Sequence, residues 1–492
     1  MASPVADSTS ALPRPRQIHP LTILLGLLFF ALVFYVRNSF ADFSQPFAYI
    51  FCGIALLAVL SGRFEALILI ILILTSTVFE LLEFPTLPIM IGDLYFSDVL
   101  IILLLIGRLA KRVTVNVVLI PKPLGYPLMA CFLVGVFSFL YATIGFQVPT
   151  NIAGIELRAL LHFTLFFLVI YYVKDEAHLK SLLWAIALMA VAVAALLMLQ
   201  YILGRDVNII SGRLEILSTT GRRFRDVMRI LVPGSILIFF VLNALIAAYI
   251  LKAMRRGRLL LLLAVSILTM GMILTFTRVY WIMILASILF FLVAARRRAI
   301  IYSRTSLLLA GVAIALALFL QTRVFNAGVI EEAVLNRYVS ILRAPTNFQH
   351  DTLFMRYLES RYAWEKIKES PWLGIGLGKA YRPLIFGNIE YENSVGGTFL
   401  HNGFLATQLK MGLPGTIAFI WLMVLFFSRF LRRWKRIQNP LRQAVVLGVA
   451  MSISGMLLHN LVASPFLTVY GASVAGFALG IVEKIYQFEG LA

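Results

Sequence analysis

Residues 401–427 read HNGFLATQLKMGLPGTIAFIWLMVLFF, and the organisation of the chain can be worked out from this stretch. A histidine and an asparagine open it. Two glycines and a proline then precede an apolar run that belongs to a membrane span expected near residues 411–430. The stretch therefore places the ionisable imidazole of His401 at the edge of a membrane, where a long polar segment ends and a hydrophobic one begins.

The composition is that of a membrane protein. The chain has 492 residues, of which 61% are hydrophobic and 13% are charged, whereas a soluble domain has about 45–50% apolar and about 25% charged residues. Apolar runs recur from end to end, and backbone groups in lipid must be satisfied within each segment. We therefore predict an all-α, polytopic membrane protein with about 12–14 transmembrane helices and one large extracytoplasmic loop that contains helices.

The charge and the cysteines exclude several classes of protein. The net charge of +20 does not indicate nucleic-acid binding, because most basic residues lie in short clusters between apolar runs, where they orient the spans. Cys52 and Cys131 both lie inside apolar runs. This position excludes a disulfide framework in the loops and any cysteine-based metal site.

Hydropathy places the spans, and the basic clusters orient them. With the N-terminus inside, nearly every basic connection falls in the cytoplasm, and both termini are expected there. A signal peptide cleaved near Ser39 is the weaker alternative, because the whole chain is membrane-embedded. We expect spans near residues 21–37, 47–61, 64–82, 95–110, 124–145, 157–173, 179–203, 228–251, 258–277, 279–295, 305–321, 411–430, 441–461 and 465–485.

The predicted organisation has five parts. They are a cytoplasmic N-terminal tail (1–20), N-terminal transmembrane helices (21–203), transmembrane helices with arginine-bearing periplasmic connections (204–320), a large periplasmic loop (321–403), and C-terminal transmembrane helices with a cytoplasmic tail (404–492). Within the large loop, interleaved acids and bases predict a helix over residues 354–368. Ser370 and Pro371 should end it, before the glycine-rich turn WLGIGLG.

Residues 204–227 are an exception to the charge rule. This short connection should lie outside, yet it contains several arginines, among them Arg222, Arg223 and Arg225. Solvated surface charge is one explanation. Anion binding is the other, because the forked guanidinium matches the oxygens of a phosphate and stays charged.

Arg278, in TFTRVYW, lies between two spans that are separated by almost no loop. A charge at that depth is a candidate for function, although an arginine that snorkels to the headgroups is the alternative. The orientation places Arg278, His401 and the arginines of 222–225 on one face of the membrane. Histidine with arginines favours acid–base chemistry on an anionic substrate, whereas a histidine alone at a helix start is more often structural.

These residues resemble a known family. His401 and Asn402, followed by Leu405 and a glycine pair, resemble the histidine-asparagine block of the O-antigen ligase and O-antigen polymerase superfamily of bacterial membrane glycosyltransferases. Arg278, in a Thr-Arg pair, resembles the family's Ser-Arg motif. The loop helix and its glycine turn also match, through Arg356, Pro371, Gly374, Gly376 and Gly378, and the glycine pair is Gly412 and Gly415.

The resemblance implies an activity at the periplasmic face of a bacterial inner membrane, in lipopolysaccharide or polysaccharide biosynthesis for the cell envelope. The donor would be a glycan on undecaprenyl pyrophosphate, and the acceptor a hydroxyl of lipid A core or of another glycan. His401 would be the catalytic base, and Arg278, with Arg223 and Arg225, would bind pyrophosphate. Neither a metal nor another cofactor is implied. Supporting roles fall to Asn402, Arg356, Gly376, Gly412 and Gly415.

Other activities remain open from the sequence. A polymerase of O-antigen or exopolysaccharide repeat units would share the same motifs and differ in its acceptor. A flippase or transporter of lipid-linked sugars would need charges along a path through the membrane, and few lie within spans. Two further pairs, Arg158 with His162 and His459 with Asn460, could line a substrate cavity or form structural hydrogen bonds between helices.

Overall fold

The structure is a computed structural model. It describes residues 63–78, 86–89, 92–114, 120–204, 207, 209–210, 212–219, 222–254, 257–295, 352–383 and 397–491, together with Ile54 and Ala58. The described chain is largely helical, which confirms the all-α class. Six of its helices are long and apolar enough to cross a membrane. The total of about 12–14 spans stays a prediction, because the spans expected near 21–37, 47–61 and 305–321 lie outside the described residues.

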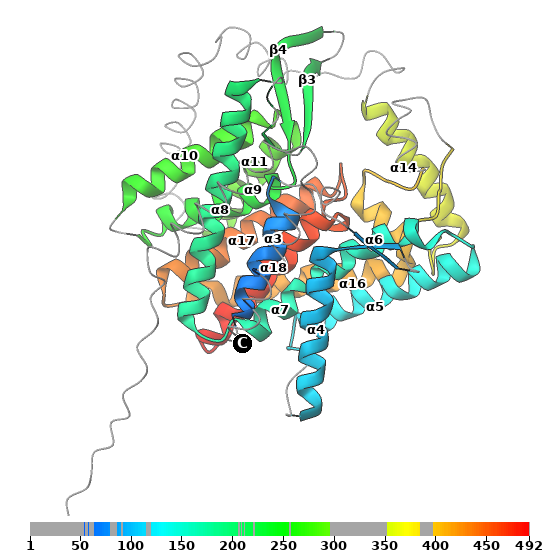
Figure 1. The fold of residues 1–492 in the computed structure, drawn as a ribbon, viewed down its shortest axis with the longest axis horizontal. Helices are drawn as coiled ribbons and strands as arrows, with labels where there is room; N and C mark the ends of the chain where they lie inside the picture. The colour runs from blue at the N-terminus through cyan, green and yellow to red at the C-terminus, as the bar shows by residue number, and fades with distance from the viewer. Residues whose placement is uncertain are drawn as a thin grey trace, which may run out of the picture.

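The described helices and strands follow the expected spans with few exceptions (Figure 1). In chain order they are α3 (Phe64–Ser76), β1 (Thr86–Ile89), β2 (Gly92–Tyr95), α4 (Phe96–Thr114), α5 (Gly125–Leu140), η2 (Tyr141–Gly145), α6 (Thr150–Phe163), α7 (Leu165–Tyr172), α8 (Glu176–Leu203), β3 (Arg213–Thr219), β4 (Arg222–Leu231), α9 (Ser235–Ile250), α10 (Arg258–Leu274), α11 (Arg278–Ala295), α14 (Thr352–Glu369), α16 (Gly403–Arg433), η3 (Trp434–Arg436), α17 (Pro440–His459), η4 (Pro465–Leu467) and α18 (Val469–Phe488).

One expected span begins later than its hydropathy indicates. The segment expected to span from residue 228 starts as strand β4, and the helix begins only at Ser235. Strand β4 pairs with β3 as an antiparallel hairpin, so the arginine-bearing connection 204–227 is not a simple loop. Hydropathy did not predict the strand, because the apolar residues Met228, Ile230 and Leu231 are continuous with the apolar run of α9. In the structure the backbone hydrogen bonds of these residues are made within the hairpin and not within a helix.

Short polar side chains mark where several helices begin. Asp175 accepts a hydrogen bond from the backbone of His178 at the start of α8, and Asn439 accepts two at the start of α17. Thr468 does the same for α18. Such N-caps satisfy backbone N–H groups that the helix itself leaves without partners. These caps determine the residues at which the helices begin, which the apolar pattern alone does not mark.

Helix α18 lies at the centre of the bundle, packed against α3, α6, α7 and α17. Small residues permit this close packing. A Cβ atom added to Gly476 would lie 2.7 Å from the carbonyl oxygen of Phe163, and one added to Gly480 would lie 2.9 Å from that of Phe166. Small residues are the usual means of bringing helix backbones together in a membrane.

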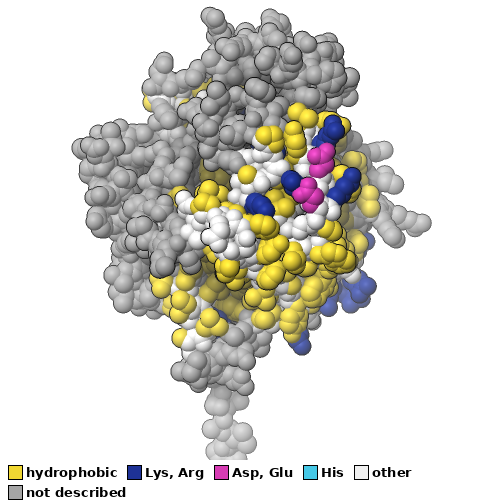
Figure 2. Space-filling view, turned by 90° about the vertical axis from the view of Figure 1, so that its right-hand side faces the viewer, with side chains coloured by type: hydrophobic (Ala, Val, Ile, Leu, Met, Phe, Trp, Pro, Cys, Tyr) yellow, Lys and Arg dark blue, Asp and Glu magenta, His cyan; other side chains and the backbone are white. Residues whose placement is uncertain are grey.

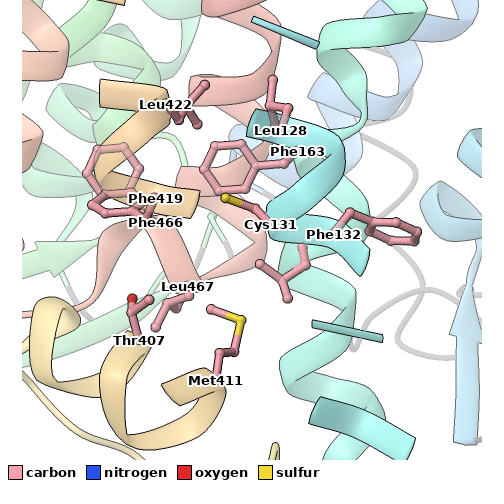
Figure 3. A pocket seen from close by; sticks show the side chains of 11 residues that line it. Leu128, Cys131, Phe132, Phe163, Thr407, Met411, Phe419, Leu422, Phe466 and Leu467 are labelled. Carbon is pink, nitrogen blue, oxygen red and sulfur yellow. The ribbon is translucent and has the colours of Figure 1, made fainter. Parts of the chain in front are cut away.

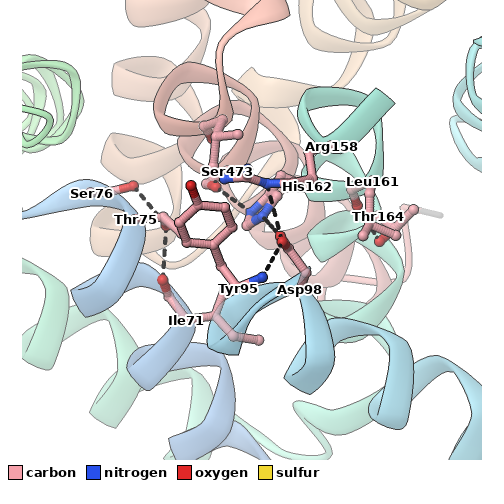
Figure 4. Close-up of polar contacts among 11 residues, drawn as sticks. Ile71, Thr75, Ser76, Tyr95, Asp98, Arg158, Leu161, His162, Thr164 and Ser473 are labelled. Carbon is pink, nitrogen blue, oxygen red and sulfur yellow. Dashed lines mark hydrogen bonds and ion pairs between the residues drawn. The ribbon is translucent and has the colours of Figure 1, made fainter. Parts of the chain in front are cut away.

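Buried charges in the bundle occur in polar networks. Asp98 at the start of α4 accepts from His162 at 2.8 Å and pairs with Arg158 at 3.1 Å (Figure 4). The other ring nitrogen of His162 lies 2.8 Å from Ser473 of α18. The guanidinium of Arg158 also stacks on the ring of Tyr95. Arg158 and His162 therefore hold three helices together, which is the structural one of their two predicted roles.

The expected loop helix and the arginine-bearing hairpin rise from the same side of the bundle, opposite the C-terminus (Figure 1). On the face that includes α14 and α5, hydrophobic side chains cover much of the described surface (Figure 2). The acidic side chains lie in its upper part, and basic side chains lie there and along its lower right edge. Such a large apolar area suits a protein that is partly in lipid.

Candidate functional site

His401 lies directly before α16 and contacts α14. Its Nδ1 atom lies 2.8 Å from Oε2 of Glu359, and its backbone nitrogen donates to the same oxygen at 3.3 Å. A carboxylate only accepts hydrogen bonds, so the proton of the neutral imidazole sits on Nδ1. Nε2 then carries a lone pair that can take a proton from another group. The His401 side chain is 27% exposed, against 6% for Glu359.

Arg382 completes this group. One of its terminal nitrogens lies 3.4 Å from the second oxygen of Glu359, and its side chain is 1% exposed. The buried carboxylate thus has a cation on one side and the imidazole on the other. Removing either partner from such a buried group leaves an uncompensated charge, so the arrangement holds the carboxylate in place.

The position of Glu359 on α14 explains why it meets His401. The predicted helix over 354–368 is confirmed, and it ends at Glu369, before Ser370 and Pro371. Glu359, Ala363 and Ile367 follow each other at four-residue spacing and are all buried, so they share one face. An acid on the buried face was the signal that sequence analysis missed, because the helix carries several acids and their exposure could not be ranked.

Asn402 fixes the beginning of α16. Its side chain accepts from the backbone of Phe404 and of Leu405, both at 3.1 Å. The backbone nitrogen of Gly403 donates to the carbonyl oxygens of Asn460 and Ala463. The first N–H groups of the helix therefore have protein partners, and this helix start is capped by the protein itself.

Gly403 is required by the close approach of Asn460, which follows α17. A Cβ atom added at Gly403 would collide with the side-chain amide of Asn460. Asn460 is 1% exposed, and among the described residues its Oδ1 atom has no hydrogen-bond partner. The start of α16 and the end of α17 are thus held in direct contact, next to His401.

Gly412 bends α16. The sequence predicted a span that begins near residue 411. The structure shows a helix from Gly403 to Arg433 with a kink at Gly412, whose φ is 62° and ψ −165°. Pro414 follows, and proline lacks the N–H that would continue the ladder. The predicted glycine and proline signal therefore marks a kink within one long helix, and His401 lies at the head of its first half.

The glycine turn after α14 forms backbone hydrogen bonds with residues of α16 on both sides of the kink. The backbone of Ile375 donates to the carbonyl of Leu409 at 2.8 Å, and that of Gly376 donates to Lys410 at 3.2 Å. Leu413 in turn donates to Pro371 at 3.1 Å. We call this set of three hydrogen bonds the backbone clasp. Three glycines of the turn, Gly374, Gly376 and Gly378, have positive φ. Cβ atoms added to them would lie 2.5 Å from the carbonyl oxygen of Leu409, 2.6 Å from Cβ of Ala142 and 2.7 Å from Cα of Ala153, respectively.

Lys410 and Glu156 tie the clasp to α6. Their ion pair measures 3.0 Å, and Lys410 also donates to the carbonyl of Lys379 at 3.0 Å. The other oxygen of Glu156 accepts from the backbone of Gly378 at 2.8 Å. Thus the clasp has a charged support, and α14 is fixed relative to the bundle. Lys379, whose carbonyl accepts from Lys410, lies in the same region, and burial is the main cause that lowers the pKa of its ammonium group.

Arg278 is the first residue of α11, at a tight junction with α10. The junction contains Phe276, which has a φ of 45° although it is not glycine and is buried. A bulky residue in this conformation is strained and is held only where the surroundings fix it. Thr277 accepts a hydrogen bond at 3.4 Å from Arg229 of strand β4. The structure thus brings a second arginine to the Arg278 junction.

Arg229 is therefore a residue that the sequence analysis missed. It was counted within a span expected from residue 228, so its charge was not considered with the cluster. The predicted Arg223 lies opposite Ser218 in the hairpin, next to its turn, whereas Arg225 falls where the register shifts. The side chains of Arg223 and Arg225 lie outside the described residues, and their role stays a prediction.

The arginine junction and the His401 group are linked through the end of α17. The ring of Tyr280 meets that of His459 edge-on, with centroids 5.8 Å apart. Asn460, which follows His459, accepts a hydrogen bond at 2.8 Å from the backbone of Gly403 at the start of α16. The end of α17 therefore contacts both α11, which Arg278 begins, and α16, which His401 precedes. The predicted residues Arg278, Arg356, Asn402 and His401 thus lie on, or next to, helices that contact one another, and their shared role stays a prediction.

An apolar pocket borders the same first half of α16. Thr407 and Met411 line it before the kink, and Phe419 lines it after the kink (Figure 3). Leu128 and Cys131 of α5 lie on the opposite side. The kink thus leaves an apolar space between α16 and α5, close to the helix that His401 precedes.

The part of the chain that the structure describes contains no group of three or more His, Cys, Asp or Glu side chains that could hold a metal ion. The polar groups of the site are instead an imidazole, a carboxylate and guanidinium groups. Together they can accept a proton and bind an anion.

The comparison with known families identifies part of the chain. Residues 263–420 match the family model described as O-antigen ligase, which confirms the resemblance for that segment. The matched segment contains Arg278, Glu359 and His401, whereas β4 and the end of α17 lie outside it. No curated protein matches the chain.

Proposed function

Since residues 263–420 match the O-antigen ligase family, we propose that the chain is a membrane glycosyltransferase that moves a glycan from undecaprenyl pyrophosphate to an acceptor hydroxyl. The observation that carries the proposal is the hydrogen bond between Glu359 and His401. It leaves Nε2 of a partly exposed imidazole free to act as a base, beside a region that is rich in arginine.

The reaction needs one proton transfer and one displacement. The acceptor oxygen attacks the anomeric carbon of the donor while Nε2 of His401 takes the hydroxyl proton. A new C–O glycosidic bond forms, the bond from the anomeric carbon to the phosphate oxygen breaks, and the lipid pyrophosphate leaves with that electron pair. Glu359 stabilises the imidazolium and keeps the ring oriented, as a carboxylate does for other catalytic histidines.

The arginines bind the leaving group. Negative charge grows on the pyrophosphate as the bond breaks, so guanidinium groups placed there stabilise the transition state more than the ground state. Arg278 is the first candidate, and Arg229 is the second because it contacts the residue before Arg278. Arg223 and Arg225 remain candidates through their place on the same strand. Asn402 supports the site through the cap, Gly376 through the clasp and Gly412 through the kink. Gly415 packs against Met411 of the same helix, where a Cβ atom would collide with that side chain.

A lipid-linked donor suits a site at the head of a membrane-spanning helix, because its isoprenoid chain is apolar and stays in the lipid while its pyrophosphate reaches the polar residues. We place the reaction at the periplasmic face of a bacterial inner membrane, with both termini in the cytoplasm. This orientation rests on the distribution of basic connections.

A ligase and a polymerase would use this chemistry alike. A ligase passes glycan to lipid A core, whereas an O-antigen or exopolysaccharide polymerase passes it to a new repeat unit. We favour the ligase-like activity because the matched family is described in those words. The identity of the acceptor separates the two.

The test is glycan transfer by the purified protein in detergent from an undecaprenyl-pyrophosphate-linked donor, without ATP and with a chelator. Wild type is compared with His401→Ala and with the control His178→Ala, since His178 lies at the start of α8. We expect transfer by wild type and the control, and loss by about 10²-fold or more in His401→Ala. Equal transfer by all three would exclude His401 as the base, and no transfer by wild type would contradict the proposed activity.

A further inference from the structure

His459, the last residue of α17, is a histidine of the site for which the proposed reaction has no use. Neither of its ring nitrogens makes a hydrogen bond within the described part of the chain. Nδ1 is buried without a partner, whereas Nε2 is not closed off from solvent in the same way. Buried polar atoms without partners are uncommon in proteins, and one beside a candidate site calls for a reason.

The two nitrogens differ in what they can do. A buried N–H without an acceptor is rarer than a buried lone pair without a donor. The stable neutral tautomer of His459 therefore has its lone pair on the buried Nδ1 and its proton on the accessible Nε2. His459 thus presents a hydrogen-bond donor, whereas His401, which donates from Nδ1 to Glu359, presents a lone pair at its Nε2.

His459 lies where the arginine junction meets the head of α16. Its ring meets that of Tyr280, two residues after Arg278 on α11, with centroids 5.8 Å apart. The next residue, Asn460, accepts a hydrogen bond from the backbone of Gly403, two residues after His401. A donor in this place is suited to an anionic oxygen, because it lies close to the residues proposed to bind and to transfer from the anionic donor.

We propose that His459 binds the pyrophosphate of the prenyl donor through Nε2–H. This inference rests on the proposed function for the identity of the ligand. The two histidines of the site then have opposite roles: His401 accepts the proton of the acceptor hydroxyl, and His459 donates a hydrogen bond to the leaving group and remains neutral.

A purely structural role for His459 makes different predictions. In that case the ring matters because it packs edge-on against Tyr280, and His459→Phe would preserve it. If the donor at Nε2 matters, His459→Gln would preserve function, since its side-chain amide can place an N–H near the same position. The two substitutions therefore separate the two roles.

The experiment measures binding of farnesyl pyrophosphate to the full-length protein in detergent, from the ligand-dependent rise of its Tm, with farnesol as the ligand control. For His459→Phe we expect binding that is about tenfold weaker or more, which is the loss of one charge-assisted hydrogen bond. His459→Gln should bind within about threefold of wild type. If His459→Phe does not fold, as judged by its Tm without ligand, His459→Leu replaces it.

Three outcomes would overturn the inference: wild type that farnesyl pyrophosphate does not stabilise, His459→Phe that binds as tightly as wild type, or His459→Gln that binds as weakly as His459→Phe. Failure of the proposed function has another signature. If wild type binds farnesyl pyrophosphate in a way that depends on His459 but transfers no glycan, the subsite stands and the glycosyltransferase activity is wrong.

Discussion

One oxygen of Glu359 receives both the backbone N–H of His401, at 3.3 Å, and its Nδ1, at 2.8 Å. The two residues are 42 positions apart, and the carboxylate is the point at which the loop helix and the head of α16 meet. A ring held through its main chain and its side chain by one acceptor has little rotational freedom. Its Nε2 lone pair is thus oriented before a substrate binds.

Glu359→Gln should therefore impair catalysis. The amide can still accept from Nδ1, but it cannot stabilise an imidazolium as a carboxylate does. We expect the rate of glycan transfer to fall by about 10²-fold. Glu365→Gln, at an exposed position of the same helix, is the matched control and should retain the wild-type rate. Because Arg382 also loses its charged partner, the Tm of each variant is measured, and a well-folded Glu359→Gln with full activity would contradict the role.

Arg278→Lys and Arg229→Lys should each reduce transfer at unchanged expression. A lysine keeps the charge but lacks the two-pronged donor that matches pyrophosphate oxygens. We expect about tenfold or greater loss in kcat for each. Arg361→Lys on the exposed face of α14 serves as the control. Parallel measurements on Arg223→Lys and Arg225→Lys decide which arginines of strand β4 take part: a loss there, with Arg229→Lys unaffected, would restore the cluster chosen from the sequence.

Gly403→Ala should destabilise the protein, since the added methyl group collides with the amide of Asn460. We expect a loss of about 2 kcal/mol in the free energy of unfolding, measured as a lower Tm in detergent. The double variant Gly403→Ala with Asn460→Ala removes the obstructing amide, so its Tm should return toward that of Asn460→Ala alone. If the two changes are additive instead, the predicted contact between α16 and α17 is wrong.

Asp98→Ala should cost stability rather than chemistry. It leaves His162 and Arg158 without their buried partner, and breaking a buried ion pair typically costs about 3–5 kcal/mol. We expect a clearly lower Tm, with a transfer rate near that of wild type at a temperature where the variant is folded. A loss of activity in a folded Asp98→Ala protein would instead place this network in the reaction.

The orientation of the site can be measured with single cysteines. A cysteine in place of Glu365, which is exposed on α14, should react with an impermeant thiol reagent added to the periplasmic side. A cysteine in place of Arg436, which is exposed in η3, should react only after the membrane is disrupted. The reverse pattern would invert the topology. Position 387, also in the large loop, lies outside the described residues.

The sequence predicted those parts of the site that short patterns encode. The helix before Pro371 and the glycine and proline signal at Gly412 follow from the conformational preferences of single residues. The role of Asn402 as a cap was not predicted, although asparagine is a preferred residue at that position. The pairing of Glu359 with His401 did not follow, because it depends on how α14 packs and not on spacing. Arg229 was missed because a hydropathy window averages over the strand and the helix that it joins. Asp98 was likewise not recognised as the partner of Arg158 and His162.

The backbone clasp also determines what can be exchanged between related proteins. Its hydrogen bonds join Pro371, Ile375 and Gly376 to residues on both sides of the kink at Gly412. A chimaera cut at the apparent border between loop and membrane, near residue 403, would separate donors from acceptors that fit each other. A graft that keeps the clasp intact therefore has to include both the turn from Pro371 to Gly376 and α16 through Leu413, although the sequence alone would place these two parts in different regions of the protein.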